Sequence, residues 1–116
     1  VLREDVAEYF EQDVYSPFMM HVVKFRPRWR ERLPAVTHVD GTGRLQSVDR
    51  ASNRLYHDLI SAVKRRTNVG IVLNTSFNEN EPVVDTPEQA VSCFMRTDMD
   101  ALCLGRYILR KPSRMQ

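Results

Sequence analysis

The sequence NRLYHDLISAVKRRTNVGIVL, residues 53–73, sets the expected fold class of this chain. Its first part repeats apolar residues at helical spacing, namely Leu55, Tyr56, Leu59, Ile60 and Val63. Ser52 or Asn53 would serve as the N-cap of this helix. The uninterrupted apolar run Ile71-Val72-Leu73 is typical of a strand that is covered on both faces. A long helix followed by a buried strand predicts an α/β fold.

The C-terminal part of the chain continues this alternation. Thr86-Pro87-Glu88-Gln89 is a typical helix start, with Thr as the N-cap and Pro at the first helical position. The apolar residues Ala101–Leu104 predict a second buried strand. Because strands and helices alternate after residue 44, we expect at least part of the sheet to be parallel.

The N-terminal part predicts shorter elements. We expect an amphipathic helix over Arg3–Glu11, a strand over Phe18–Val23 and a basic loop or short helix opened by Pro27. Two β-capable runs, residues 35–39 and 44–48, flank Asp40-Gly41-Thr42-Gly43 and predict a hairpin. The chain has neither an internal repeat nor a Gly/Ser-rich linker, so we expect residues 1–116 to form a single domain.

The composition, 42% hydrophobic and 28% charged residues, is that of a globular protein. No apolar run approaches the roughly 20 residues of a membrane-spanning helix, so we expect no membrane partner. Cys93 and Cys103 lie among apolar neighbours, which predicts two buried, reduced thiols in a cytoplasmic protein. The three histidines have no metal-ligand spacing with each other or with the cysteines, so we expect no metal site in this chain.

Arginine is over-represented, since 14 of the 17 basic residues are Arg. One explanation is function, because a guanidinium binds planar anions such as phosphate and carboxylate. The other is GC-rich codon usage without any function. The net charge of +2 with 15 acidic residues is weak for a nucleic-acid-binding protein.

Two loops are candidate binding sites. Ser76 and Asn78 follow the expected strand 71–73 and lie two residues apart, so in an extended segment both would face one ligand. Arg44 follows a Gly-rich turn that could approach an anion, and His38 and Asp40 could form a base–orienter pair on one strand face. In both loops the alternative is that the polar residues only stabilise turns.

A third candidate is the basic stretch Lys24–Arg32, which interleaves aromatic and basic residues. Such a stretch could bind single-stranded nucleic acid by stacking and charge. A solvated basic face with Trp29 as a packing anchor is the simpler interpretation.

Three strings carry a resemblance to a known family: LPAVTHVDGTGR at residues 33–44, LNTSFN at 73–78 and EPVV at 81–84. They resemble the C-terminal part of the nodulation and antibiotic-biosynthesis O-carbamoyltransferases, and the similarity extends from Arg3 to Tyr107. This resemblance implies a YrdC-like α/β fold, a twisted mixed sheet with flanking helices, in a truncated version. The family's Gly-Pro-Arg-Ala segment and a further Lys-containing segment would lie upstream of Val1.

The resemblance also implies a function. The domain would bind ATP and carbamoyl phosphate as substrates and form carbamoyl adenylate. A separate N-terminal, metal-dependent domain of the same protein would pass the carbamoyl group to an acceptor hydroxyl. The chain would thus act as a carbamoyltransferase within the full-length protein and would be inactive alone.

By resemblance, the substrate- and nucleotide-binding residues are Arg44, Ser76 and Asn78. Further candidates for the same role are Thr75, His38, Lys24 and Arg26, and Lys24-Phe25-Arg26-Pro27 matches a Lys-x-Arg-Pro string of the wider fold at a different position. The alternatives to this function are a nucleic-acid-binding YrdC-like module and a structural docking domain without a catalytic role.

Overall fold

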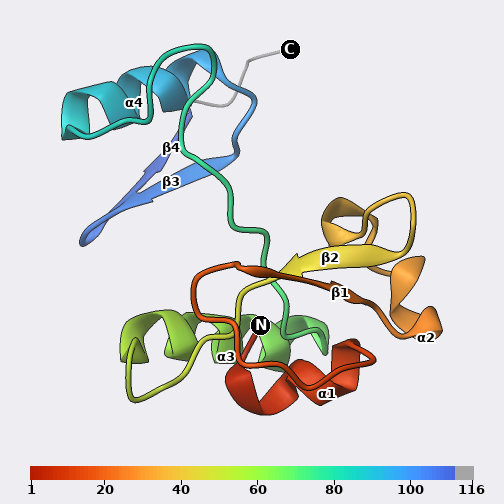
Figure 1. The fold of residues 1–116 in the computed structure, drawn as a ribbon. Helices are drawn as coiled ribbons and strands as arrows, with labels where there is room; N and C mark the ends of the chain where they lie inside the picture. Colours follow the sequence, from red (N-terminus) through yellow and green to blue (C-terminus); the bar gives the residue numbers. More distant parts are fainter. Residues whose placement is uncertain (112–116) are drawn as a thin grey trace. The chain divides into compact units, whose positions relative to one another are not determined.

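The computed structural model describes residues 1–111. The chain forms two compact units, and their boundary in the sequence lies between Leu73 and Asn74 (Figure 1). The expectation of a single domain over residues 1–116 stays a prediction. None of the helices in residues 1–111 combines the length and the apolar character that crossing a bilayer requires.

The first unit combines short helices with a two-stranded sheet. Its elements are the 3-10 turn η1 (Arg3–Asp5), α1 (Val6–Tyr9), β1 (His21–Lys24), α2 (Pro27–Arg30), the 3-10 turn η2 (Pro34–Val36), β2 (Thr42–Leu45) and α3 (Arg54–Thr67). β1 and β2 are antiparallel, with His21 opposite Leu45 and Lys24 opposite Thr42. The expected N-terminal helix is therefore present as η1 and α1, and the expected short helix at Pro27 as α2.

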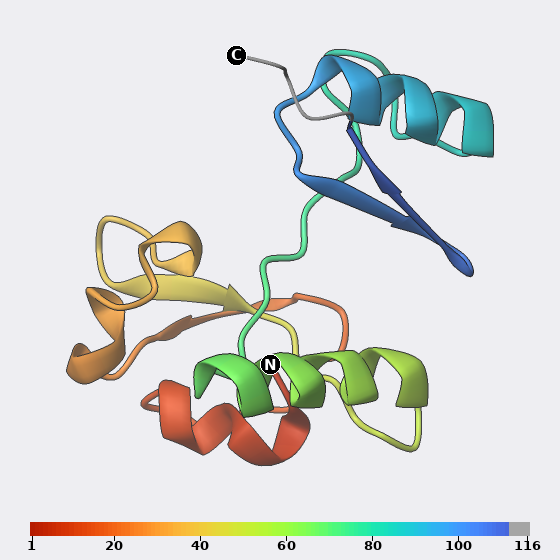
Figure 2. The same ribbon diagram turned by 180° about the vertical axis from the view of Figure 1, so that it is seen from behind.

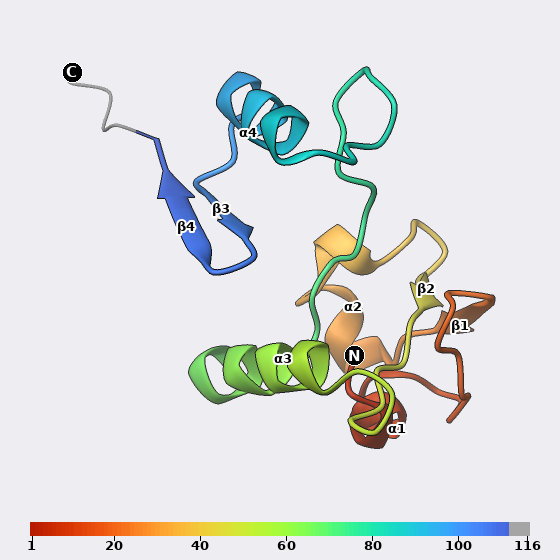
Figure 3. The same cartoon turned by 90° about the vertical axis from the view of Figure 1, so that its left-hand side faces the viewer.

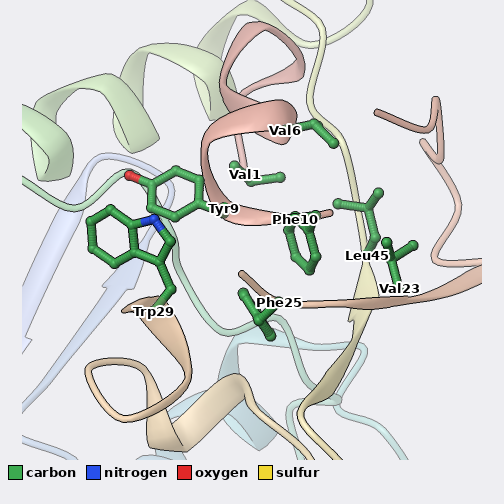
Figure 4. Packing of buried hydrophobic residues seen from close by; sticks show 8 residues of the cluster. All are labelled: Val1, Val6, Tyr9, Phe10, Val23, Phe25, Trp29 and Leu45. Atoms are coloured by element: carbon green, nitrogen blue, oxygen red, sulfur yellow. The ribbon is translucent and has the colours of Figure 1, made fainter. Parts of the chain in front are cut away.

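The core of the first unit lies between α1 and the β1–β2 sheet (Figure 4). It contains eight buried apolar residues: Val1, Val6, Tyr9, Phe10, Val23, Phe25, Trp29 and Leu45. The rings of Phe10 and Phe25 stack with their centroids 4.3 Å apart, and Tyr9 packs against Trp29 at 4.8 Å. Aromatic pairs at these distances add attraction beyond the burial of their surface, so they tie α1 to the strand and to α2.

α3 lies alongside the N-terminal segment (Figure 2). Asn53 caps the helix, since its side chain accepts a hydrogen bond from the Tyr56 N–H. Lys64 Nζ lies 2.7 Å from Asp5 Oδ2, and a second core cluster of Leu2, Val48 and Ile60 fills the contact. The N-terminal segment is thus held to α3 by both charge and apolar packing.

The second unit contains α4 (Pro87–Arg96), β3 (Ala101–Leu104) and β4 (Tyr107–Arg110) (Figure 3). β3 and β4 form an antiparallel hairpin, and Gly105 in its turn has a φ of +58°, which favours glycine. α4 packs on the hairpin through a cluster of Ala90, Phe94 and Leu102. The Thr86 hydroxyl caps α4 by accepting from the Gln89 N–H at 3.2 Å, as the sequence predicts.

The α/β class is confirmed, because helices and short strands occur in both units. The expectation of a partly parallel sheet is wrong for residues 1–111, where both sheets are antiparallel and the parallel pairing is one bridge between Leu2 and Val48. Ile71–Leu73 is not a strand in this structure, although Ile71 and Val72 pack partly buried against the two core clusters of the first unit. The apolar character of Ile71 and Val72 is therefore explained by their packing against the core, without a strand at this position.

Two further expectations are corrected. Residues 35–39 do not pair with 44–48, since Pro34–Val36 forms a 3-10 turn and β2 pairs with β1 instead. The expected strand at Phe18–Val23 begins only at His21. Both cysteines are free, but Cys93 is buried whereas Cys103 is exposed, because β3 turns Cys103 away from the core cluster that holds Leu102.

Candidate functional site

The outer face of the β1–β2 sheet carries two cations. The register places Val22 opposite Arg44 and Lys24 opposite Thr42, and residues opposite each other point to the same side of a sheet. The other side carries the buried residues Val23, Gly43 and Leu45, so Lys24 and Arg44 lie on the outer side. They are diagonal neighbours there, a relationship that separates residues by roughly 7–8 Å. Two long, flexible cations at this spacing can contact one anion together.

The turn before β2 presents an ordered polar group beside these cations. The His38 N–H donates to the Thr42 carbonyl at 2.7 Å, and the Gly41 N–H donates to the His38 carbonyl at 2.9 Å. The Asp40 carboxylate accepts from the Thr42 hydroxyl at 2.7 Å and from the Thr42 N–H at 3.0 Å. These two hydrogen bonds, the hydroxyl's first, hold the pKa of Asp40 below its ordinary value.

His38 and Asp40 meet through Thr42. His38 Nδ1 lies 2.9 Å from the Thr42 hydroxyl oxygen. Because that hydroxyl gives its proton to Asp40, it can only accept from His38, which assigns the proton of the imidazole to Nδ1. The expected direct pair on one strand face is therefore replaced by a chain from His38 through Thr42 to Asp40, built on a turn. Within residues 1–111 no hydrogen bond to the remaining ring nitrogen, Nε2, is seen, so this nitrogen can accept one from a ligand.

Close approach explains the glycines of this turn. Gly41 has a φ of +79°, and a Cβ there would lie 3.0 Å from Arg30 Nε. A Cβ at Gly43 would lie 2.5 Å from the ring of Phe25, a distance that side chains do not tolerate. Gly43 thus lets β2 lie close to the Phe25 ring of the core, and the alternation of side chains along β2 places Arg44 on the outer side.

Much of the basic stretch 24–32 completes α1. The Arg26 Nε donates to the Ala7 carbonyl at 2.9 Å, and the Arg26 N–H donates to the Tyr9 carbonyl at 2.8 Å. The Trp29 Nε1 and the Arg28 guanidinium both donate to the Glu8 carbonyl. The last carbonyls of a helix have no partner within the helix, so these side chains cap the C-terminal end of α1.

Trp29 is a packing anchor, as one interpretation of the sequence holds. Its ring is buried in the core, and the guanidinium carbons of Arg28 and Arg32 lie 5.6 and 4.7 Å from the ring centroid. The N-terminal acids compensate part of the basic charge, since Arg30 pairs with Glu11 at 2.9 Å. A buried ring cannot serve as a stacking surface for bases.

The second unit holds the other candidate residues. Ser76 is exposed, and in the described part of the chain no hydrogen bond to its hydroxyl is seen. The Thr75 hydroxyl donates to the Ser76 carbonyl at 3.2 Å. Asn78 is half-buried and its Nδ2 donates to the Glu81 carbonyl at 2.8 Å, so part of this amide stabilises the loop, as the alternative interpretation expects.

The candidate residues therefore lie in two groups, with Arg26 apart from both. Lys24, His38 and Arg44 belong to the outer side of the first unit's sheet and its preceding turn, and Arg26 belongs to the cap of α1. Thr75, Ser76 and Asn78 belong to one loop of the second unit. Sequence reasoning missed Thr42, although its position two residues after an Asp is typical of an Asx turn. It also missed Arg96, which has no local sequence signal.

A charged depression of about 550 Å³ on the first unit is a weaker candidate. Its lining is formed by Arg3, Glu4, Asp13, Asp49, Arg50 and His57. These groups already pair, Arg3 with Asp13 and His57 Nε2 with Glu4 Oε1 at 2.8 Å, so a charged ligand would have to displace them. Within residues 1–111 no cluster of His, Cys, Asp and Glu side chains is suited to hold a metal ion.

Proteins with similar sequences include nodulation proteins and a carbamoyltransferase. Nodulation protein NolNO of Sinorhizobium fredii is 50% identical over 96% of this chain, and nodulation protein NolO of Bradyrhizobium diazoefficiens is 46% identical over 99%. The 3'-hydroxymethylcephem-O-carbamoyltransferase of Amycolatopsis lactamdurans is 39% identical over 66% of the chain. The chain spans 17%, 22% and 14% of the lengths of these three relatives.

The family model described as carbamoyltransferase C-terminus matches residues 1–111, the whole of the described chain. The match includes both units and every candidate residue. The chain therefore belongs to the carbamoyltransferase C-terminus family.

Proposed function

We propose that this chain is the part of a longer carbamoyltransferase that binds ATP and carbamoyl phosphate for the formation of carbamoyl adenylate. The observation that carries the proposal is the outer face of the β1–β2 sheet, where Lys24 and Arg44 stand as diagonal neighbours beside the His38–Thr42 pair. Arg44 supplies a bidentate grip on a phosphate and Lys24 supplies a point charge. In the second unit, the Ser76 hydroxyl and the Asn78 amide are the groups that we propose for substrate binding.

The proposed reaction fits this composition of the site. ATP, carbamoyl phosphate and water give carbamoyl adenylate, pyrophosphate and phosphate. Both organic substrates are polyanions, so bringing them together requires charge neutralisation and fixed orientation more than it requires an acid or a base. Lys24 and Arg44 neutralise charge, and the imidazole Nε2 of His38, an acceptor while Nδ1 carries the proton, accepts a hydrogen bond from the carbamoyl NH₂ group.

The partner in this proposal is the remainder of the longer protein. The nodulation proteins and the carbamoyltransferase that resemble this chain are about five to seven times longer than the matched segment. We assign the transfer to an acceptor hydroxyl, and the metal ion that assists it, to an N-terminal domain of that protein. The free thiols of Cys93 and Cys103 fit a reducing compartment, so we place the enzyme in the cytoplasm.

The test uses the full-length enzyme that contains this chain. Arg44→Ala should lower kcat/KM for carbamoyl phosphate-dependent pyrophosphate release by roughly 5- to 150-fold, the equivalent of about 1–3 kcal/mol for a lost charged contact. Arg44→Lys should recover only part of the loss, because the bidentate fork is missing. The matched control is Arg66→Ala, at an exposed arginine near the end of α3. Wild-type kinetics in Arg44→Ala would contradict the proposal and favour a structural docking role.

The nucleic-acid alternative makes a different prediction. It requires affinity for short RNA that falls steeply as salt is raised. The buried ring of Trp29 and the capping roles of Arg26 and Arg28 remove the features of residues 24–32 that favoured it. Salt-insensitive or absent RNA binding, together with an Arg44 defect in pyrophosphate release, distinguishes the proposed enzyme from such a module.

A further inference from the structure

The loop that carries Asn78 is closed at its base by the second unit's core. The Val84 N–H donates to the Phe77 carbonyl at 3.0 Å, which joins the two ends of residues 77–84. Phe77 and Val84 are partly buried against the cluster of Ala90, Phe94 and Leu102. These contacts fix where the loop begins and ends, but they do not reach the polar residues 78–81 within it.

Arg96, in the last turn of α4, supplies the missing contacts. Its guanidinium donates to Glu81 Oε1 at 2.6 Å and to Glu79 Oε2 at 3.4 Å. A third N–H donates to the Ser92 hydroxyl at 2.6 Å, four residues earlier in the same helix. The fork is therefore oriented by its own helix while it holds two carboxylates of the loop.

Glu81 passes this constraint to Asn78. Its Oε2 accepts the Asn80 N–H at 3.1 Å, and its backbone carbonyl accepts Asn78 Nδ2 at 2.8 Å. Backbone N–H groups of Glu81 and Asn80, together with the Arg96 guanidinium, hold the pKa of Glu81 below its ordinary value, so the carboxylate is charged at neutral pH. The chain of contacts runs from the Arg96 fork through Glu81 to the Asn78 amide.

We infer that Arg96 is a positioning residue of the substrate loop, which sets the orientation of the Asn78 amide through Glu81 without touching substrate itself. This inference rests on the proposed function, because it assigns the purpose of the oriented amide to substrate binding. Arg96 and both glutamates are solvent-accessible, and accessible ion pairs add little to folding stability. Without Arg96, α4 therefore stays folded. The loop becomes disordered, because it loses the contacts to Glu79 and Glu81.

A direct readout of the inference needs no activity. In the 116-residue chain, the side-chain amide NMR signals of Asn78 should shift, and their exchange with solvent should speed up, in Arg96→Gln. Arg96→Lys should give an intermediate result, since a point charge keeps one contact and loses the fork. The matched control is Arg106→Gln, at an exposed arginine in the β3–β4 turn. Asn78 signals that are unchanged in Arg96→Gln would overturn the inference.

Kinetics of the full-length enzyme give the second readout. Arg96→Gln should raise KM for carbamoyl phosphate roughly tenfold with a smaller change in kcat and an unchanged Tm. Glu81→Gln should do the same, and the double variant should be no worse than either single variant, because both break one chain of contacts. Strictly additive defects, or a lowered Tm that accounts for the loss, would contradict the positioning role.

Asn78→Ala separates the two ideas. If it impairs carbamoyl phosphate-dependent turnover whereas Arg96→Gln does not, the positioning role fails and the proposed function stands. If Asn78→Ala and Arg44→Ala both leave turnover unchanged, the proposed function fails. A shifted Asn78 signal in Arg96→Gln would then still establish that Arg96 orients the amide, while its link to substrate would be refuted.

Discussion

Thr42 is the residue on which the polar turn of the first unit depends. Its hydroxyl donates to Asp40 and accepts from His38, and its N–H gives Asp40 a second hydrogen bond. One side chain therefore fixes the orientation of a carboxylate and the tautomer of an imidazole. Substitution of Thr42 would remove the side-chain partner of His38 and one of the two hydrogen bonds of Asp40, while both groups themselves remain.

Thr42→Val should raise the pKa of Asp40 toward the ordinary aspartate value of about 3.9, without reaching it, because the N–H of residue 42 remains. A carboxyl whose folded-state pKa is lowered stabilises the fold above its ordinary pKa, and this stability is lost as the pH falls through the folded value. The acid-induced loss of stability should therefore be smaller in Thr42→Val. An NMR titration of the Asp40 carboxyl carbon measures the change, and Thr37→Val, whose hydroxyl bonds the Leu33 carbonyl, is the control. An identical Asp40 titration in Thr42→Val would contradict this account.

Among the elements, α3 has a start that is defined by a side-chain cap. The sequence left Ser52 and Asn53 as alternative caps, and the structure selects Asn53, whose side chain accepts the Tyr56 N–H at 3.1 Å. The Ser52 hydroxyl instead donates to the Asp49 carbonyl at 3.1 Å, within the loop before the helix. Ser52 and Asn53 are neighbours, but one stabilises the loop and the other caps the helix, so they form a matched pair for mutation.

Asn53→Ala should destabilise the first unit by about 1 kcal/mol, the usual cost of losing an N-cap. Ser52→Ala should cost clearly less, because it leaves the first turn of the helix capped. Urea denaturation of the two variants, followed by circular dichroism at 222 nm, compares them directly. Equal losses in both variants would show that the cap contributes no more than the loop hydrogen bond, which would contradict this prediction.

Sequence reasoning succeeded where the signal is local. The Thr86 cap of α4 and the helix predicted from the spacing in residues 55–63 are confirmed. Where the sequence leaves two alternatives, the structure has the cap at Asn53 and a short helix beginning at Pro27. Each of these signals acts within a few residues of chain. Strand pairing is not local: β2 pairs with β1, about 20 residues earlier, rather than with the nearer residues 35–39. The grouping of Lys24 with Arg44 depends on that pairing, so no local pattern could place the two residues on one face.

The exposed leucines of α3 show the same limit. Periodicity predicts a buried face with Leu55, Leu59 and Ile60, yet only Ile60 and His57 are buried, and Leu55 is 84% exposed. Period alone cannot say how much of an apolar face the neighbouring elements cover. Likewise Arg96 binds the loop at Glu79 and Glu81, which lie some 15 residues earlier in the chain. No sequence motif predicts this contact.

At the scale of the whole molecule, the chain corresponds to a small share of its relatives. It is 50% identical to a nodulation protein of which it spans 17%. The family assignment therefore concerns a C-terminal part, and the proposed chemistry divides between this part and the rest of the longer protein. Adenylate formation and carbamoyl transfer should be separable by testing the two parts.

The 116-residue chain alone should show no carbamoyl transfer to an acceptor hydroxyl, because we assign transfer to the N-terminal metal-dependent domain. The comparison is between the chain and the full-length enzyme, each supplied with ATP, carbamoyl phosphate and acceptor, with the carbamoylated product measured by mass spectrometry. Removal of divalent metal by chelation should abolish transfer in the full-length enzyme. Transfer by the chain alone at the rate of the full-length enzyme would refute this division of labour.

The burial of Trp29 also makes the unfolding of the two units distinguishable by fluorescence. The 116 residues contain one tryptophan, and it lies in the core of residues 1–73 next to Tyr9. Its emission spectrum therefore reports the unfolding of the first unit, whereas residues 74–111 contribute one exposed tyrosine, Tyr107. Excitation at 295 nm isolates that tryptophan, so its fluorescence can follow one half of the molecule while circular dichroism follows both.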